Sequence, residues 1–388
     1  MTRIARLLKP LDEFVRVETA SGLVLLVAAA IALVLANSEW HAAYERVWDA
    51  SWLPGGLTPH FLVNEVLMAV FFLVVGLEIR REMHDGALST PAQATLPLVA
   101  AAGGILVPAL IYGAFADAAV TNGWAIPTAT DIAFAVGVLA LLGRRVDADL
   151  RVLLLAIAIA DDIAAVLIIA FFYAEGIAPA GLALAAAGAV AAWLGHRAGL
   201  NAWIACLLPG AVIWYGFLLA GIHPALAGVA AGLLTPMKRR EPDAEPQATR
   251  LESALHPWVA FGVMPLFALA NAGVRFEGLD LASSLAQGLA GGIALGLFAG
   301  KPLGIVLATW IGVRTGLCRL PDGVGPAGIA VIGCLAGIGF TMSIFIAALA
   351  FEGSPLLAVA KFGVLAGSLG AAVAGLLLGR LLLRPASD

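Results

Sequence analysis

Long apolar runs separated by short polar segments fill the chain from position 20 to position 382. A helix needs roughly 17–25 mainly apolar residues to cross about 30 Å of hydrocarbon. We count about twelve such runs: 20–36, 60–79, 95–116, 121–142, 152–173, 179–195, 202–220, 223–236, 256–272, 286–311, 326–350 and 357–382. The run at 223–236 is short, and Pro209 interrupts the run before it. The pattern predicts an all-α polytopic membrane protein with about twelve transmembrane helices, and it excludes an outer-membrane barrel, whose strands would alternate polar and apolar residues.

The amino-acid composition supports a membrane protein and argues against nucleic acid as a partner. The chain is 61% hydrophobic and 12% charged, with a mean hydropathy of +0.98, so a single soluble core cannot hold its apolar residues. The short loops leave no room for a separate soluble domain, and we expect one membrane domain over residues 1–388 embedded in a lipid bilayer. A net charge of −4 spread over short loops gives no basic patch for nucleic acid. The three cysteines form no external pair and are expected to be free thiols.

The basic residues give the orientation. With the N-terminus in the cytoplasm, 18 of the 22 Lys and Arg residues fall in inside-facing segments, as the positive-inside rule requires. An even number of spans then also leaves the C-terminus in the cytoplasm. A signal peptide ending near Ala36 is the alternative for the first run, but Asp12, Glu13 and Glu18 precede the run and argue against it.

Ionisable residues lie within several of the predicted spans. Asp131 falls near the centre of 121–142, the adjacent Asp161 and Asp162 fall near the centre of 152–173, and Lys301 lies inside 286–311. An aspartate at the centre of a spanning helix costs roughly 2.5–3.5 kcal/mol on insertion scales. These side chains must therefore face one another or water, and the aspartate pair is the first candidate for a functional site.

Two groups of three spans share a further feature, a helix breaker in the middle span. Pro127 interrupts the middle run of residues 95–173, and glycines such as Gly337 interrupt the middle run of residues 286–382. Interrupted segments at corresponding positions of two halves indicate inverted repeats with a binding site at the midplane of the membrane. Asp131 has the charge to neutralise the N-terminal ends of the broken helices and Lys301 the C-terminal ends. A purely electrostatic role without part in transport is the alternative for both.

The aspartate pair has the chemistry of a cation site. Adjacent residues of an α-helix point about 100° apart, so Asp161 and Asp162 cannot both face one partner. Carboxylate oxygens suit a small hard cation rather than a soft metal. Protons and such a cation compete for the same oxygens, and that competition is sufficient for exchange of one for the other. A structural ion pair with Lys301 is the alternative, but it explains one aspartate and leaves the second.

Other polar residues have competing interpretations. His223 begins a short span, where an imidazole can respond to pH or can serve as a cap. Glu78 lies near the inner end of its span beside Arg81, as an ordinary interfacial charge does. The external residues 37–58 carry three tryptophans, which predict either an interfacial belt or a small hairpin at a dimer contact. The inner loop 237–255 is either a solvated anchor or a regulatory charge cluster.

Several segments together resemble the NhaA-type sodium–proton antiporter family. They run through most of the chain: 71–78 (FFLVVGLE), 127–134 (PTATDIAF), 160–163 (ADDI), 255–259 (LHPWV), 271–274 (NAGV), 300–304 (GKPLG) and 337–345 (GIGFTMSIF). This family is itself an example of an inverted-repeat transporter, so the repeat argument and the resemblance are not independent.

The resemblance implies a fold, an activity and roles for particular residues. It implies twelve helices with two interrupted helices that cross at the midplane, in the bacterial inner membrane, and a homodimer joined through an external hairpin at about 41–57. It implies electrogenic exchange of Na⁺ or Li⁺ for more than one proton, for pH and sodium homeostasis, without a cofactor. Asp162 would be the main cation ligand, with Asp161 as its partner and a proton carrier. Further roles are implied for Lys301, which would pair with Asp161, for Thr130 and Asp131, which would line or balance the helix crossing, and for Glu78, Arg81, His223, Glu252 and His256, which would set the pH response.

Some residues differ from the family pattern, and other classes of membrane protein have to be compared with it. Glu65 replaces a more usual Asp of the family, and Thr249 and Ser253 stand where some relatives carry ionisable residues, so the pH response is less transferable than the exchange. An intramembrane aspartyl protease needs Asp where Phe340 stands. A membrane prenyltransferase needs a second Asp-rich motif, which the chain lacks. A passive cation channel is the remaining alternative.

Overall fold

The computed structural model describes residues 3–52, 54–174, 176, 178–237, 245–279, 281–321 and 323–383, with side chains of the first helix given at position 17 and from position 19 onward. Every regular element in these residues is helical. Nine of the helices there are long and apolar enough to cross a membrane, and the number rises to eleven if each of two bent pairs counts as one span. The all-helical membrane architecture expected from the sequence is confirmed.

The chain divides into two compact units, which we describe separately. The first consists of Met1–Glu39, Ala92–Asp162 and Asn271–Asp388, and the second of Trp40–Pro91 and Ile163–Ala270. Helix α7 (Ala148–Phe172) contributes its residues up to Asp162 to the first unit and the remainder to the second. The other elements of the first unit are α1 (Arg3–Ala36), α5 (Pro91–Phe115), η3 (Ala118–Thr128), α6 (Ile132–Ala140), η4 (Gly143–Arg145), α13 (Ser284–Leu295), η6 (Gly296–Gly300), α14 (Lys301–Arg314), α15 (Pro326–Ala336), α16 (Phe340–Ala350) and α17 (Leu356–Leu382).

The second unit holds the remaining elements. They are α2 (His41–Asp49), η1 (Pro54–Gly56), α3 (Pro59–Phe61), η2 (Leu62–Leu67), α4 (Met68–Asp85), α8 (Pro179–Arg197), α9 (Ala202–Ala220), α10 (Leu226–Leu234), α11 (Gln247–Trp258), η5 (Val259–Val263) and α12 (Met264–Asn271). Elements η2, η5 and η6 are π-helical turns, and each is continuous with α-helix on either side of it.

Each run expected from the sequence contains a helix, but the count of twelve spans stays a prediction. Helix α10 has nine residues, too few to cross a bilayer unaided. Helix α9 runs without a break through Pro209. The two interrupted runs are bent pairs: η3 and α6 meet at 50°, and α15 and α16 meet at 45°. Residues 41–49, in the expected external hairpin, form helix α2.

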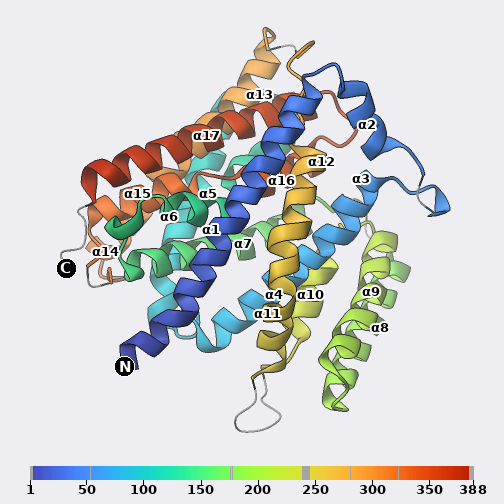
Figure 1. Ribbon diagram of the computed structural model, residues 1–388, viewed down its shortest axis with the longest axis horizontal. Helices are drawn as coiled ribbons and strands as arrows, with labels where there is room; N and C mark the ends of the chain where they lie inside the picture. Colours follow the sequence, from blue (N-terminus) through green and yellow to red (C-terminus); the bar gives the residue numbers. More distant parts are fainter. Residues whose placement is uncertain are drawn as a thin grey trace. The chain divides into compact units, whose positions relative to one another are not determined.

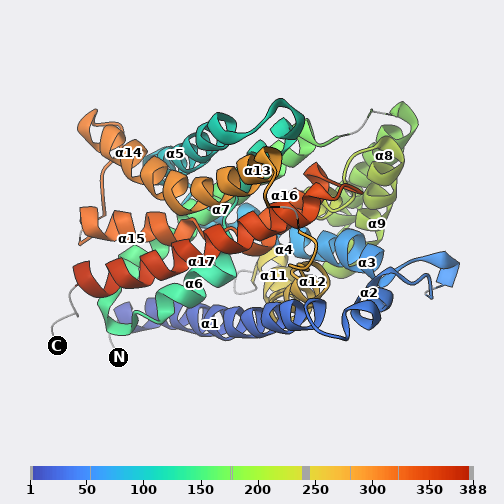
Figure 2. The same ribbon diagram turned by 90° about the horizontal axis from the view of Figure 1, so that it is seen from above.

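Close helix packing in the first unit depends on small residues. Figures 1 and 2 both show α13 lying along α17. On α5 and α14, Gly103 and Gly304 face each other so closely that a Cβ atom on either would overlap the backbone of the other. Inside a bilayer, where lipid tails are as apolar as leucine, such close van der Waals contact is a main source of helix association.

The second unit contains two closely packed helix pairs. Helices α8 and α9 run side by side (Figure 1), and α10 packs on α4. A Cβ atom added to Gly228 of α10 would collide with the backbone of α4 at Ala69 and Leu73. Leu73, Leu77, Cys206 and Leu251 form a buried cluster in this unit with other apolar side chains of α4, α9, α10 and α11.

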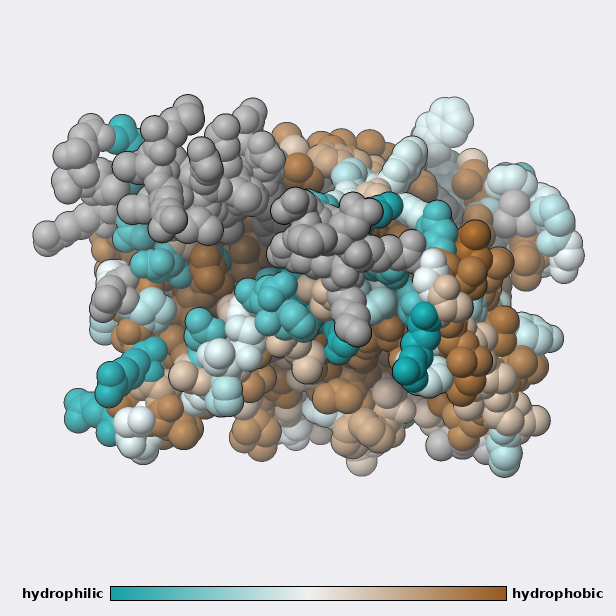
Figure 3. Space-filling view, turned by 90° about the horizontal axis from the view of Figure 1, so that it is seen from below, coloured by the Kyte–Doolittle hydropathy of each residue, from teal (hydrophilic) through white to brown (hydrophobic). Residues whose placement is uncertain are grey.

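Large apolar side chains cover much of the molecular surface. They make up broad areas of the face in Figure 3, with hydrophilic patches between them. Leu110, Phe171 and Leu381 are 71%, 78% and 78% exposed. Apolar patches of this extent are typical of a surface in contact with lipid. The basic run Lys238–Arg240 of the expected inner anchor, together with Glu241 and Asp243, lies outside the described residues.

Candidate functional site

The aspartate pair lies in the interior of an uninterrupted helix. Asp161 and Asp162 are 2% and 5% exposed, and they sit more than two turns from either end of α7. The neighbouring residues Ile157–Ala160 are all buried as well. A carboxylate in such surroundings needs a charged or hydrogen-bonding partner, because the interior of a bilayer offers no water to replace one.

Lys301 supplies that partner from the start of α14. Its Nζ lies 2.7 Å from Oδ2 of Asp161, and both side chains are fully buried. The same ammonium donates to the backbone carbonyl of Thr128, at the C-terminal end of η3. Lys301 therefore lies between one carboxylate and one helix C-terminus, both of which favour a positive charge.

The break between η3 and α6 brings two more predicted residues to this place. The hydroxyl of Thr130 lies 2.6 Å from Oδ2 of Asp161. Asp131 is the N-cap of α6, where its Oδ1 accepts from the N–H of Phe134 at 3.0 Å. A carboxylate at this position satisfies a backbone donor that has no partner within the helix and interacts favourably with the positive end of the helix dipole.

The second break lies against the first through hydrogen bonds. The N–H of Asp131 donates to the carbonyl of Ile338 at 2.7 Å. The other carboxylate oxygen of Asp131 accepts from the N–H of Thr341 at 3.1 Å and from the Thr341 hydroxyl. Asp131 thus caps the N-terminal ends of both α6 and α16, while its role in compensating charge stays a prediction. Crossing of the two pairs at the midplane stays a prediction.

The charges at this centre do not cancel. Asp161, Asp162 and Lys301 belong to the same buried group, and the field of Asp162 also acts on Lys301. Two carboxylates and one ammonium leave one negative charge when all three are ionised. Among the described residues, none donates a hydrogen bond to Oδ1 of Asp161, although that atom is buried. An acceptor without a donor in a buried, anionic site is suited to a proton or to a hard cation.

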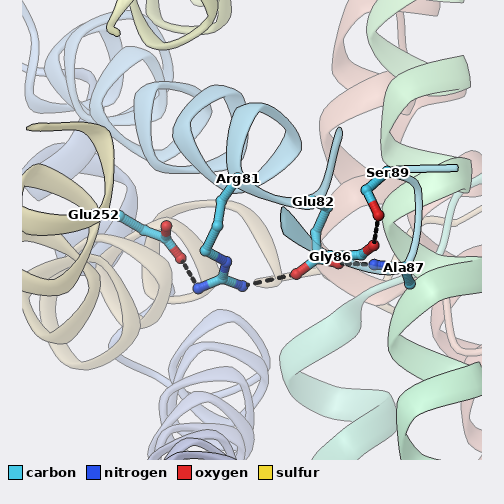
Figure 4. A network of polar contacts seen from close by, with 6 residues as sticks. All are labelled: Arg81, Glu82, Gly86, Ala87, Ser89 and Glu252. Atoms are coloured by element: carbon cyan, nitrogen blue, oxygen red, sulfur yellow. Dashed lines mark hydrogen bonds and ion pairs between the residues drawn. The ribbon is translucent and has the colours of Figure 1, made fainter. Parts of the chain in front are cut away.

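A second polar cluster lies in the second unit, at the end of α4 (Figure 4). Arg81 donates from Nη1 to Glu252 of α11 at 2.6 Å and from Nη2 to Glu82 at 3.2 Å. The other oxygen of Glu82 accepts from the N–H of Ala87 at 2.8 Å. The guanidinium therefore joins two helices to the loop that follows α4. Glu252 is 5% exposed, whereas the Arg81 side chain is 32% exposed.

The remaining predicted residues of the pH response divide between two places. Glu78 interacts electrostatically with Arg81, and His256 with Glu252, so both belong to the Arg81 cluster. His223 lies beside Glu65 instead. Its Nε2 lies 3.4 Å from Oε1 of Glu65, and its Nδ1 accepts from the N–H of Ala225. Glu65 precedes Arg81 by 16 positions on the same helical stretch, about 24 Å at 1.5 Å per residue.

Comparison with known proteins identifies the family. The model of the family described as Na+/H+ antiporter 1 matches residues 12–378. The chain belongs to this Na⁺/H⁺ antiporter family. A protein of Acidovorax sp. named Na(+)/H(+) antiporter NhaA is 52% identical over 382 residues, which cover 95% of this chain and 91% of the relative. One of Bordetella petrii with the same name is 49% identical over 425 residues, with 96% and 91% covered.

The match confirms the resemblance drawn from the sequence. A relative of Pseudomonas putida, named Na(+)/H(+) antiporter NhaA 2, is 47% identical over 426 residues, with 97% of this chain and 94% of the relative covered. Every candidate residue, from Glu78 to Lys301, lies within the segment that the antiporter family model matches. These antiporter relatives and the apolar helices together make the chain a multi-pass membrane protein.

Sequence reasoning missed several polar contacts of the breaks. Ser343 donates to the carbonyl of Ile126 at 2.7 Å, and Ser368 of α17 accepts from the N–H of Phe340, the first residue of α16. The sequence signal for Ser343 was present, because it stands four residues after Gly339 of the break. Ser368 carries no such signal, since single serines are common in spanning helices. The pairing of Glu65 with His223 joins positions 158 apart, and no pattern along the chain indicates it.

Proposed function

We propose that the protein expels Na⁺ across the membrane in exchange for protons. Membership of the antiporter family supports this proposal, and so do the names of its relatives. The observation that carries it is the buried anionic centre on α7. There Lys301 forms an ion pair with Oδ2 of Asp161, while Oδ1 of Asp161 accepts no hydrogen bond from the described residues. Such a centre holds either a proton or a cation.

The proposed cycle gives each buried residue a task. Asp162 is the main ligand of Na⁺ or Li⁺, and Asp161 is its partner and a proton carrier. Lys301 stays on Asp161 when no cation is bound and moves off as one arrives. Thr130 and Asp131 hold the two breaks around the site. A cation therefore enters only when protons leave, and the protein alternates between faces with one kind of cargo at a time.

The same charges make the exchange electrogenic. Two carboxylates that both carry protons on one half of the cycle return more than one proton for each single-charged cation. Net positive charge then moves with the protons, so the membrane potential contributes to driving sodium out, at about 2.3 kcal/mol per elementary charge and 100 mV. Exchange of this kind serves pH and sodium homeostasis.

The proposal also covers the membrane topology, the oligomeric state and the pH response of the protein. The distribution of basic residues and the family support twelve spans with inverted repeats, both termini in the cytoplasm and a bacterial inner membrane. We propose a homodimer joined by residues 41–57, where Tyr44 and Trp48 pack edge to face. Glu78, Arg81, Glu252 and His256 adjust the rate to pH from the end of α4, and His223 does so from its contact with Glu65.

A liposome experiment tests the exchange. The protein is reconstituted with an imposed pH gradient, and internal pH is followed as Na⁺, Li⁺ or K⁺ is added, with Asp162→Asn in parallel. We expect Na⁺ and Li⁺, but not K⁺, to collapse the pH gradient. In liposomes with Asp162→Asn, none of these cations should change the internal pH. Cation movement without coupled proton movement would contradict antiport and would indicate a passive channel.

A further inference from the structure

The hydroxyl of Thr130 faces two hydrogen-bond acceptors with one hydrogen. Its Oγ1 lies 2.6 Å from Oδ2 of Asp161 and 2.8 Å from the backbone oxygen of Ala336. A threonine hydroxyl donates one hydrogen bond and accepts others through its lone pairs. Both oxygens are acceptors when Asp161 is ionised, so only one of the two contacts is a donated bond at any moment.

The carbonyl of Ala336 depends on this hydroxyl. Ala336 is the last residue of α15, and the final carbonyls of a helix have no partner within it. The backbone N–H groups that follow Ala336 donate to other acceptors. That of Gly337 donates to the carbonyls of Gly333 and Cys334, that of Ile338 to the carbonyl of Leu335, and that of Phe340 to the hydroxyl of Ser368. In the part of the chain that the structure describes, Thr130 is the donor that reaches Ala336. Without it, a buried carbonyl is left unsatisfied.

The state of the carboxylate decides where the hydrogen goes. The charged groups around Thr130 come from three elements: Asp161 and Asp162 on α7, Lys301 on α14, and Asp131 at the start of α6. An ionised carboxylate is the stronger acceptor, so in the empty site the hydrogen points to Asp161. A cation on the aspartates repels that hydrogen and attracts the oxygen lone pair. The hydroxyl then turns its hydrogen to Ala336.

We propose that Thr130 is a two-way hydrogen-bond switch that links occupancy of the aspartate pair to the C-terminal end of α15. Cation binding completes the bond from Thr130 to Ala336 and fastens the second break to the first. Release of the cation returns the hydrogen to Asp161 and loosens α15. This inference rests on the proposed cation exchange and adds to it the residue through which the site acts on a broken helix. By linkage, a fastened α15 also favours the bound cation.

Three substitutions separate this role from simple packing. Thr130→Val keeps the shape and removes the hydroxyl, whereas Thr130→Ser keeps the hydroxyl. Thr309→Val is the matched control, because Thr309 is a buried threonine of α14 whose hydroxyl has no hydrogen-bond partner among the described residues. In liposomes we expect Thr130→Val to raise the KM for Na⁺ about tenfold, because the variant loses the bond to Ala336 and the oxygen lone pair that favour the cation-bound state. Thr130→Ser and Thr309→Val should stay within about threefold of the unmodified protein.

A native cysteine reports on α15 directly. Cys334 lies two residues before Ala336 and is 7% exposed. With Cys206 and Cys318 replaced by alanine, the rate at which N-ethylmaleimide modifies Cys334 measures how firmly this end of α15 is held. We expect Na⁺, but not K⁺, to slow the modification several-fold in the parent protein, in Thr130→Ser and in Thr309→Val. Na⁺ should have no effect in Thr130→Val.

The possible outcomes distinguish the switch from the proposed function. Slowing by Na⁺ that persists in Thr130→Val overturns the switch, and a raised KM beside that result assigns Thr130 to cation binding alone. If Thr130→Val fails to reach the membrane, the parent protein still decides, because Cys334 modification that ignores Na⁺ overturns the switch. A parent protein without Na⁺-dependent proton movement in liposomes contradicts the proposed function instead.

Discussion

Two ion pairs of nearly equal length lie in very different surroundings. Lys301 and Asp161, in the first unit, are 2.7 Å apart with both side chains fully buried. Arg81 and Glu252, in the second unit, are 2.6 Å apart, but about a third of the Arg81 side chain is exposed. The first pair is surrounded by breaks in helices, and the second sits near the end of a continuous one. Distance alone would rank the two pairs as equals.

Their surroundings give the two pairs different uses. A buried pair is expensive to desolvate and is weak evidence for stability, so its charges are better explained by cargo that must be bound and released. A partly exposed pair gains little from its Coulomb energy but responds to the solution around it. We therefore expect changes at the first pair to remove transport or folding, and changes at the second to move its pH dependence.

The largest effect is expected at Asp162. Asp162→Asn keeps the size of the side chain and removes the charge that the cation needs. We expect exchange to fall to the level of empty liposomes, while the variant inserts and elutes as a single species in detergent. Rates near those of the unmodified protein would place the cation site elsewhere. The adjacent Ile163→Val, a substitution without change of charge, is the matched control.

The next effect concerns the stability of the buried pair. Lys301→Met leaves Asp161 as an uncompensated buried charge, and removing one partner of such a pair costs about 3–5 kcal/mol. Thermal unfolding in detergent should show a marked drop in Tm. Adding Asp161→Asn removes the stranded charge, so the double variant should recover much of the loss without recovering exchange. A double variant as unstable as Lys301→Met would mean that the two residues do not act as a pair.

A smaller effect is expected at Asp131. Asp131→Ala removes the N-cap of α6 and the acceptor for Thr341, and loss of a cap costs about 0.5–2 kcal/mol. Asp131→Asn keeps an oxygen for one cap and loses the charge, so its Tm should lie between those of the unmodified protein and Asp131→Ala. Equal Tm values for all three would remove Asp131 from the support of the breaks.

The smallest effect is expected at the partly exposed pair. Glu252→Gln removes a charge beside Arg81 and His256, which favours proton release from the ionisable groups that remain. We expect the profile of exchange rate against pH to move toward acid by about one unit, the equivalent of roughly 1.4 kcal/mol, with the maximal rate preserved. An unchanged profile, or a loss of maximal rate, would break the contrast between the two pairs. Glu245→Gln, two residues before the start of α11, controls for loss of a negative charge.

The fold was predictable to the extent that lipid imposes it. The apolar runs give the helices because every spanning backbone must satisfy its own hydrogen bonds. The two breaks were predictable from Pro127 and Gly337, which disfavour continuous helix. The length of α10 was not, because an apolar run does not show where the helix within it ends. Nor did Pro209 break α9, since membrane helices tolerate proline when their surroundings satisfy the freed carbonyl.

The candidate site was predictable in its charges and less so in its hydrogen bonds. Asp161, Asp162 and Lys301 stand out because a charge in an apolar run is rare. The division of Lys301 between Asp161 and the carbonyl of Thr128 did not follow from the sequence, because backbone carbonyls carry no sequence signal. The same limit applies to the bond between Thr130 and Ala336, which joins positions 206 apart.

The π-helical turn η6 lies directly before Lys301. The number of residues in this turn determines the direction in which the Lys301 side chain points. A π turn holds one residue more than an α turn, and the side chains after it are rotated by about 100° relative to those before it. Deleting a single residue from Gly296–Gly300 would let the stretch relax to regular α-helix and would turn Lys301 to another face. The extra residue of the π turn thus sets the position of the Lys301 charge. We therefore expect a one-residue deletion in this turn to impair exchange as severely as the loss of Lys301 itself.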